Sequence, residues 1–133
     1  MGAIIPKNVI FGLGSIKGTG QDDLIVGSDL ADDTDGNPGA DCIVGGPGAD
    51  TILGNRGADV LLGGEGNDII VGGREADYLY GQEGNDILAG DDGNDVIYGG
   101  PGDDQIDGGT GNDICFGDAG TDTFVNCETI NDS

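Results

Sequence analysis

Hydrophobic and polar residues recur with a period of nine over residues 18–125, which divide into twelve nonapeptides that each begin with glycine. The last three residues of a nonapeptide form a triplet whose middle residue, at position eight, is apolar in nearly every copy. A side-chain period of two is typical of a half-buried strand. We therefore predict a short strand in each nonapeptide, with its middle side chain facing inward. These inward positions are Ile25, Thr34, Ile43, Ile52, Leu61, Ile70, Leu79, Leu88, Ile97, Ile106, Cys115 and Phe124.

The six residues before each triplet are rich in glycine and aspartate, which predicts a turn, because glycine readily adopts the positive φ angles that turns need. Strands and turns that alternate in this way give a flattened coil, with two nonapeptides in each lap. The twelve nonapeptides therefore predict six laps of stacked parallel strands, with a thin aliphatic core between two sheets.

The two ends of the chain depart from the period. Residues 1–17 carry both lysines, and we expect them to form an N-terminal cap over the open end of the stack, as terminal units do in repeat proteins. This stretch is too short and too broken, by Pro6, Gly12 and Gly14, to span a membrane. We expect residues 126–133 to form a C-terminal cap or tail, with residues 18–125 as the repeat domain.

Composition and charge change this picture. The chain has 133 residues with 30 Gly, no Trp and no His, and its formal net charge is −22. Such a chain repels itself when compact, so disorder remains open for the metal-free state. Multivalent cations are the obvious means of offsetting the charge. Nucleic acid and anionic membranes are not expected partners, because the chain has only four basic residues.

Aspartate occupies the sixth position of all twelve nonapeptides, from Asp23 to Asp122. Positions that are two nonapeptides apart lie on the same edge of the coil, so the carboxylates form two columns. Calcium prefers six to eight hard oxygen ligands in flexible geometry, whereas magnesium demands a tighter octahedron. Histidine or cysteine at regular spacing, which softer metals need, is absent from the sequence. The pattern therefore favours calcium.

The consensus G-G-x-G-x-D-x-(apolar)-x resembles the RTX repeat, the calcium-binding parallel β-roll of secreted bacterial proteins. The resemblance implies an all-β, right-handed parallel β-roll and an extracellular location. It also implies calcium ions between the turns of neighbouring laps, held by aspartate carboxylates and by carbonyls of the glycine-rich turns. The implied carboxylate ligands are Asp41, Asp50, Asp59, Asp68, Asp77, Asp86, Asp95, Asp104, Asp113 and Asp122. The implied turn glycines are Gly45, Gly48, Gly54, Gly57, Gly63, Gly66, Gly81, Gly84, Gly90, Gly93, Gly99, Gly102, Gly108 and Gly111.

The twelve turns allow ten sites between turns of successive laps, and ten Ca²⁺ would bring +20 against the net charge of −22. Position four lacks glycine in three turns, where Gln21, Leu30 and Glu75 stand instead. Pairs of intact turns predict six occupied sites, at Asp41/Asp59, Asp50/Asp68, Asp68/Asp86, Asp86/Asp104, Asp95/Asp113 and Asp104/Asp122. Asp59/Asp77 and Asp77/Asp95 are weaker candidates, and the two N-terminal pairs are the weakest.

The acidic run at residues 29–36 does not fit an EF-hand loop. When Gly36 takes the invariant sixth position, Ala31 and Cys42 stand where Asp at the first position and Glu at the twelfth are required. It ends in Asp33-Thr34-Asp35 instead of an apolar triplet, so we expect a bulge or a loosened lap there. Its extra carboxylates, Asp29, Asp33 and Asp35, are expected to be solvated.

The outward residues of one predicted sheet form an apolar and aromatic stripe, which we call the aromatic face. Its members are Val60, Leu62, Tyr78, Tyr80, Val96, Tyr98, Ile114 and Phe116. The stripe predicts a contact surface for self-association or a partner domain. Ordinary strand propensity of β-branched and aromatic residues explains it equally well.

The chain has three cysteines. Cys115 and Cys127 are separated by somewhat more than one nonapeptide, about where the coil returns beside itself, and we favour a disulfide that locks the last lap. The alternative is a buried thiol at 115 and an unrelated one at 127. Cys42 is left over, either free or intermolecular.

No unique constellation interrupts the repeating aspartates, so we expect no enzyme activity. Three functions remain open: an autonomous extracellular calcium-binding module, a C-terminal module of a larger secreted enzyme or adhesin, and a calcium-dependent binder of polysaccharides or cell surfaces.

Overall fold

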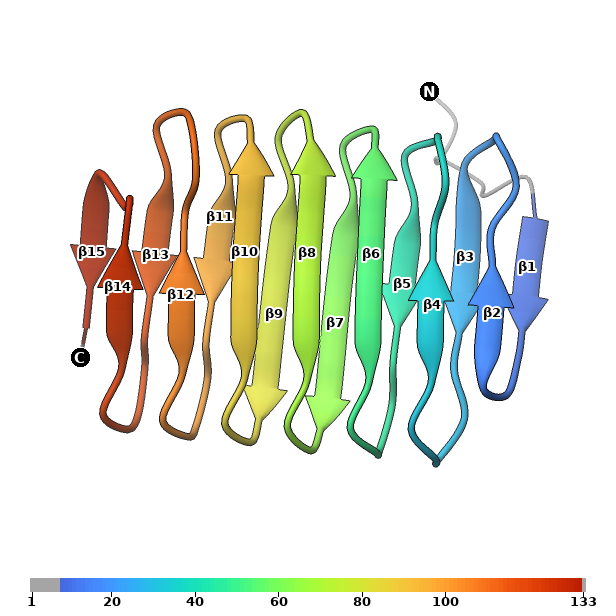
Figure 1. The fold of residues 1–133 in the computed structure, drawn as a ribbon, viewed down its shortest axis with the longest axis horizontal. Coiled ribbons are helices and arrows are strands. Elements are labelled where there is room, and N and C mark those ends of the chain that lie inside the picture. Colours follow the sequence, from blue (N-terminus) through green and yellow to red (C-terminus); the bar gives the residue numbers. More distant parts are fainter. Residues whose placement is uncertain (1–7, 133) are drawn as a thin grey trace, which may run out of the picture.

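The computed structural model describes residues 8–132, which form fifteen β-strands in two parallel sheets (Figure 1). Over these residues, no helix is long and apolar enough to cross a bilayer. The strands are β1 (Asn8–Phe11), β2 (Ser15–Lys17), β3 (Asp23–Val26), β4 (Asp33–Asp35), β5 (Cys42–Val44), β6 (Thr51–Arg56), β7 (Val60–Glu65), β8 (Ile69–Arg74), β9 (Tyr78–Glu83), β10 (Ile87–Asp92), β11 (Val96–Tyr98), β12 (Gln105–Asp107), β13 (Ile114–Phe116), β14 (Thr123–Val125) and β15 (Thr129–Asn131).

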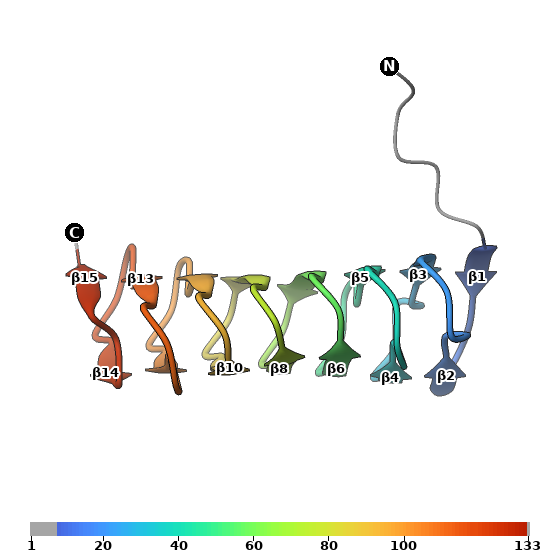
Figure 2. The same cartoon turned by 90° about the horizontal axis from the view of Figure 1, so that it is seen from above.

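Odd-numbered strands form an eight-stranded sheet and even-numbered strands a seven-stranded one, each in sequence order. Figure 2 shows the sheets as two layers, with the chain crossing between them at every turn. This arrangement confirms the predicted all-β parallel β-roll. It has about seven turns, one more than predicted, because β1 and β2 pair in parallel with β3 and β4 and so extend the coil into the expected N-terminal cap. Residues 1–7 of that cap lie outside the described residues.

A single ladder of inward side chains forms the core. Eleven of the twelve predicted inward residues, including Thr34, are buried, and only Phe124, at the C-terminal end, is half-buried. Aligned register stacks each inward residue on its counterpart in the next lap, as in Ile43 on Leu61. Ile16, which lies outside the nonapeptides, continues the ladder and is 4% exposed.

The run at residues 29–36 corrects one prediction, because Asp33–Asp35 is a regular strand rather than a bulge. Thr34 is 3% exposed and pairs with Ile16 on one side and Ile52 on the other. Threonine is β-branched and close in shape to valine, so it fits a strand that neighbours on both sides hold in register. Asp35 is half-buried rather than solvated, and it accepts a 3.0 Å hydrogen bond from the Asn37 amide.

The last lap is shorter than the others. Strand β15 pairs with β13 so that Thr129 lies opposite Ile114, whereas a full lap of two nonapeptides would bring Asp132 to that place. The favoured disulfide between Cys115 and Cys127 is present, with Cα atoms 6.0 Å apart. Cys42 is a free thiol, and burial raises its pKa.

Candidate metal-binding turns

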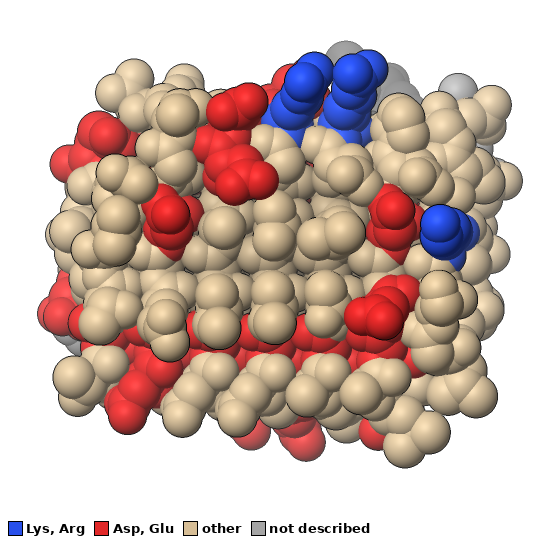
Figure 3. Space-filling view, viewed as in Figure 1, with Lys and Arg blue, Asp and Glu red and all other residues tan. Residues whose placement is uncertain are grey.

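The structure places the twelve repeat aspartates in two columns on opposite edges of the roll. The column that contains Asp41 and Asp59 lies in turns that enter odd-numbered strands, and the column that contains Asp50 and Asp68 lies in turns that enter even-numbered strands. All are buried, most at 3% exposure or less, except the half-buried Asp122. Figure 3 shows a row of acidic atoms, partly covered by other side chains, across the lower half of this face.

One oxygen of each carboxylate joins two laps. The backbone N–H of Asp41 donates to Oδ1 of Asp59, and that of Asp50 donates to Oδ1 of Asp68, both at 2.8 Å. The same bond recurs along both columns as far as Asp122. At the short last lap, Oε2 of Glu128 accepts from the Asp113 amide instead.

The second oxygen of ten carboxylates has no hydrogen-bond partner although it is fully buried. These atoms are Oδ2 of Asp41, Asp50, Asp59, Asp68, Asp77, Asp86, Asp95, Asp104, Asp113 and Asp122. An unsatisfied buried polar atom costs about 1–3 kcal/mol, and more when it is charged. Ten of them would cost at least about 10 kcal/mol, which rivals the stability of a whole domain, about 5–15 kcal/mol. The arrangement therefore fits a bound cation.

The predicted turn glycines border these oxygens. A Cβ at Gly45, the first position of its nonapeptide, would lie 2.5 Å from Asp50 Oδ2 and 2.6 Å from the Gly63 carbonyl oxygen. The other first-position glycines meet the same two kinds of atom, except that Gly117 meets Asp122 Oδ2 and the Asp132 side chain instead of a carbonyl. Position-four glycines lie against the backbone of the preceding lap, and a Cβ at Gly48 would lie 2.7 Å from the Leu30 carbonyl oxygen. Glycine thus brings carboxylates and carbonyls together at each turn.

Electrostatics in the columns disfavours the bare carboxylate. Burial, followed by nearby like charges, raises the pKa of Asp41 to about 7 and that of Asp77 to about 8. Burial likewise raises the pKa of Asp59, Asp68 and Asp86 to about 6. These groups would accept protons near neutral pH unless a cation offset their charge.

Asp23 and Asp32 are different, and sequence reasoning missed the residues responsible. The backbone N–H and the hydroxyl of Thr19 donate to Asp23 Oδ2 at 2.5 and 3.0 Å, and those of Ser28 donate to Asp32 Oδ2 at 2.6 and 2.9 Å. Burial alone would raise the pKa of both carboxylates, but these donors lower it. The sequence signal that could have revealed these donors is the hydroxyl residue, Thr19 or Ser28, at the second position of each of these two nonapeptides.

The turn at Glu75 also departs from its neighbours. Glu75 takes a positive φ of 74°, and its Oε2 accepts a 2.6 Å hydrogen bond from the Gly57 amide. Its charge adds to the forces that raise the pKa of Asp77. The turn thus keeps a positive φ at position four although glycine is absent there, and it gains one more carboxylate.

Three or more Asp, Glu, His or Cys side chains do not gather as a metal cluster anywhere in the described residues. The carboxylates instead form evenly spaced columns, so a cation here would have to draw further ligands from backbone carbonyls. Calcium, which takes carboxylate and carbonyl oxygens together, suits this donor set.

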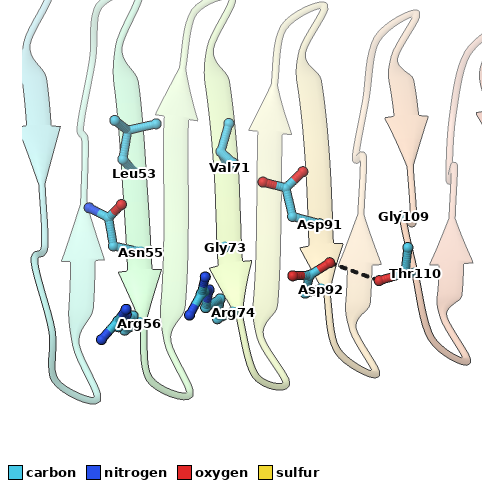
Figure 4. Close-up of a pocket in the computed structure, with 10 residues that line it drawn as sticks. All are labelled: Leu53, Asn55, Arg56, Val71, Gly73, Arg74, Asp91, Asp92, Gly109 and Thr110. Atoms are coloured by element: carbon cyan, nitrogen blue, oxygen red, sulfur yellow. Dashed lines mark hydrogen bonds between the residues drawn. The ribbon is translucent and has the colours of Figure 1, made fainter.

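A hollow lies on the outward face of β6, β8 and β10 and extends to the turns that carry Asp59, Asp77 and Asp95 (Figure 4). Its volume is about 470 Å³, and its lining includes Arg56 and Arg74, which are paired in register on adjacent strands. In Figure 4, Asp92 turns toward Thr110 rather than toward Arg74, and the Thr110 hydroxyl donates to it at 2.9 Å.

Comparison with known proteins found one family. The family model of the RTX calcium-binding nonapeptide repeat matches residues 35–70, 62–97 and 89–124. These matches run continuously from residue 35 to residue 124, well over half of the 133 residues. A search of curated proteins found no match.

Proposed function

The chain belongs to the RTX calcium-binding nonapeptide repeat family, and on that basis we propose that it is an extracellular module that folds when calcium binds between its turns. Repeats of this family typically occur in secreted bacterial proteins and are typically non-catalytic. We accordingly propose a secreted module without enzyme activity. Residues 18–125 would form the calcium array, and residues 1–17 and 126–133 its two ends.

The observation that carries the proposal is the set of ten buried, unpartnered Oδ2 atoms. Bound calcium supplies positive charge to these oxygens. The chain's own contribution is to bring two laps together through the Asp N–H to Oδ1 bonds and to keep the space beside Oδ2 free of Cβ atoms. Because the carboxylates converge only in the stacked coil, binding energy becomes folding energy.

Counting bound ions tests this proposal. Metal-stripped protein is dialysed against millimolar calcium, and bound calcium is measured per chain. We expect at least the six ions of the intact turn pairs and at most ten. Fewer than four bound ions would overturn the proposal.

We propose that the aromatic face is a contact surface. Tyr80 stacks on Tyr98 with ring centroids 5.0 Å apart, and Tyr98 stacks on Phe116 at 4.5 Å. Tyr78 and Ile114 nevertheless remain exposed, at 48% and 39%. Sedimentation of the calcium-loaded chain over a range of concentrations is expected to show self-association. A strict monomer whose Tyr78 is fully accessible to a soluble quencher would contradict it.

The arginine pair favours a second function, binding of an acidic polysaccharide. Like charges directly opposite each other on neighbouring strands are destabilising. Within residues 8–132, neither the Arg56 nor the Arg74 guanidinium forms a hydrogen bond or an ion pair. The carboxylate of an acidic sugar would accept hydrogen bonds from both guanidinium groups. The hollow also offers Asn55 and Asp91 to sugar hydroxyls and has a size usual for ligand sites.

Retention on immobilised polygalacturonate in millimolar calcium tests this second function. The double variant Arg56→Gln/Arg74→Gln is expected to bind at least about tenfold more weakly, because each lost charged hydrogen bond is worth about 1.5–3 kcal/mol. Lys17→Gln, which removes a basic residue outside the hollow, is the matched control. Equal retention of the double variant and the control would exclude the arginine pair as a sugar site.

A further inference from the structure

The second residue of each nonapeptide has two backbone states. In ten turns, from Asn37 to Asp118, it has a positive φ, for example 67° at Asn37 and 116° at Gly64. We call these the open turns. Thr19 and Ser28 are not among the described residues with positive φ. We call their two turns the hydroxyl turns.

The backbone state determines where the N–H group of that residue points. In open turns at Gly46, Gln82 and Gly100, the N–H donates to the first-position carbonyl of the next lap, at 2.9 to 3.2 Å. In the hydroxyl turns it donates to the aspartate of its own turn. The same amide cannot serve both acceptors, so in these five turns it bonds either forward to the next lap or inward to the carboxylate of its own turn. In the open turn at Asn37 the N–H donates to Asp35 Oδ1, so there too it leaves the aspartate of its own turn, Asp41, without this donor.

The two states coincide with the state of the carboxylate. All ten open turns contain an aspartate whose Oδ2 is buried and unpartnered, and neither hydroxyl turn does. In the hydroxyl turns an N–H and an O–H occupy Oδ2, while Oδ1 accepts from the Asn8 side chain or the Gly14 amide. These two carboxylates are satisfied entirely by the chain.

Residue chemistry explains the division. Glycine, and to a lesser degree asparagine and aspartate, tolerate positive φ, whereas β-branched threonine resists it. Serine and threonine also bring a hydroxyl that bonds locally to a nearby carboxylate. The non-glycine residues in open turns are mainly Asn and Asp, with Gln82 as the exception at φ 75°.

We propose that the second residue of each nonapeptide decides whether its turn requires calcium, and that Thr19 and Ser28 make the first two turns independent of calcium. This proposal rests on the proposed function, because it presumes that the open turns bind the ion. The N-terminal lap then starts the coil with satisfied carboxylates, and the calcium-requiring turns begin at Asp41.

Converting turns in both directions tests the proposal. Gly64→Ser replaces a glycine of a central open turn by a hydroxyl residue. Gly64→Asn is its matched control, because both variants add a Cβ that would meet the Gly46 carbonyl oxygen, and Asn occupies this position at positive φ in Asn37 and Asn55. Ser28→Asn is the reverse conversion. For each variant and for wild type, we would count bound calcium per chain after equilibrium dialysis and follow amide hydrogen exchange at the altered turn.

Gly64→Ser is expected to bind at least one ion fewer than Gly64→Asn, and Ser28→Asn at least one ion more than wild type. Protection of the residue-28 amide should become calcium-dependent in Ser28→Asn only. Equal ion counts for Gly64→Ser and Gly64→Asn would overturn the proposal. If Gly64→Ser fails to fold in calcium, Ser28→Asn decides alone, and an unchanged count there would overturn it. A wild-type chain that binds no calcium would instead refute the proposed function.

Discussion

At the scale of single residues, each of the ten repeat aspartates from Asp41 to Asp122 divides its two oxygens between two tasks. Oδ1 accepts the N–H of the aspartate one lap earlier, and Oδ2 faces the first-position glycine of its own turn. The first task holds the laps in register and requires only the chain. The second leaves a buried anionic oxygen that only a proton or a cation can satisfy, as the raised pKa values also indicate.

Removing one carboxylate should weaken calcium binding more than removing a surface charge. Asp68→Asn takes away a buried oxygen in the middle of a column, whereas Asp29→Asn changes an exposed residue. Losing an outer partner of a metal ligand already costs about 10–100-fold in affinity, so loss of a ligand should raise the calcium concentration at half-folding at least about tenfold. A calcium titration of each variant, followed by circular dichroism, measures this midpoint. Equal midpoints for the two variants would argue against Asp68 as a ligand.

The metal-free chain should respond to pH in a defined direction. The folded pKa values of about 7 for Asp41 and about 8 for Asp77 lie above the ordinary value of 3.8. The folded state then binds more protons than the unfolded state, so stability falls as pH rises. The contribution is fully present below about pH 4 and is lost by about pH 8. Metal-stripped protein should show more β structure at about pH 4.5 than at about pH 8 by circular dichroism, and the reverse order would be inconsistent with buried carboxylates.

At the scale of elements, the strands are too short to stand alone. Several, such as β5 and β11, have three residues, and only the stack above and below supplies their hydrogen bonds. The end laps therefore need other support. The first has the Thr19 and Ser28 donors, and the last has Glu128 and the disulfide.

The disulfide should matter mainly for the last lap. Cys127→Ser is expected to lower the free energy of unfolding by about 3 kcal/mol, since the bridge closes a short loop, with a sequence separation of 12, in the unfolded chain. Faster amide exchange should be confined to β13–β15. Cys42→Ser, which removes the free thiol, is the control and should leave both quantities nearly unchanged. If Cys127→Ser loses no more unfolding free energy than Cys42→Ser, the disulfide contributes little to stability.

The sequence predicted elements better where the period is strict than where it fails. The apolar residues at position eight of the nonapeptides correctly predicted the core. When one side of a strand is buried, apolar side chains recur at every second residue, and this period can be recognised in the sequence. Asp33-Thr34-Asp35 was misjudged because hydrophobicity alone ignores the two neighbouring strands that impose register. The donors at Thr19 and Ser28 were missed because their role depends on the backbone angle at one position, which composition does not reveal.

At the scale of the whole molecule, the roll is a stack in which each lap contacts mainly its neighbours. Such stacks fold cooperatively when the interfaces between units contribute most of the stability. Here the interfaces from Asp41 onward carry the unpartnered carboxylates, so calcium would act at each of these steps of the stack. A chain of net charge −22 has little to oppose its own repulsion without these ions.

A calcium titration of metal-stripped protein at neutral pH, followed by far-ultraviolet circular dichroism, examines this coupling of binding and folding. We expect little β structure in excess chelator and a steep, cooperative gain of β structure between micromolar and millimolar calcium. A β-sheet signal that is already complete in excess chelator, and unchanged by millimolar calcium, would show that the roll folds without the ion.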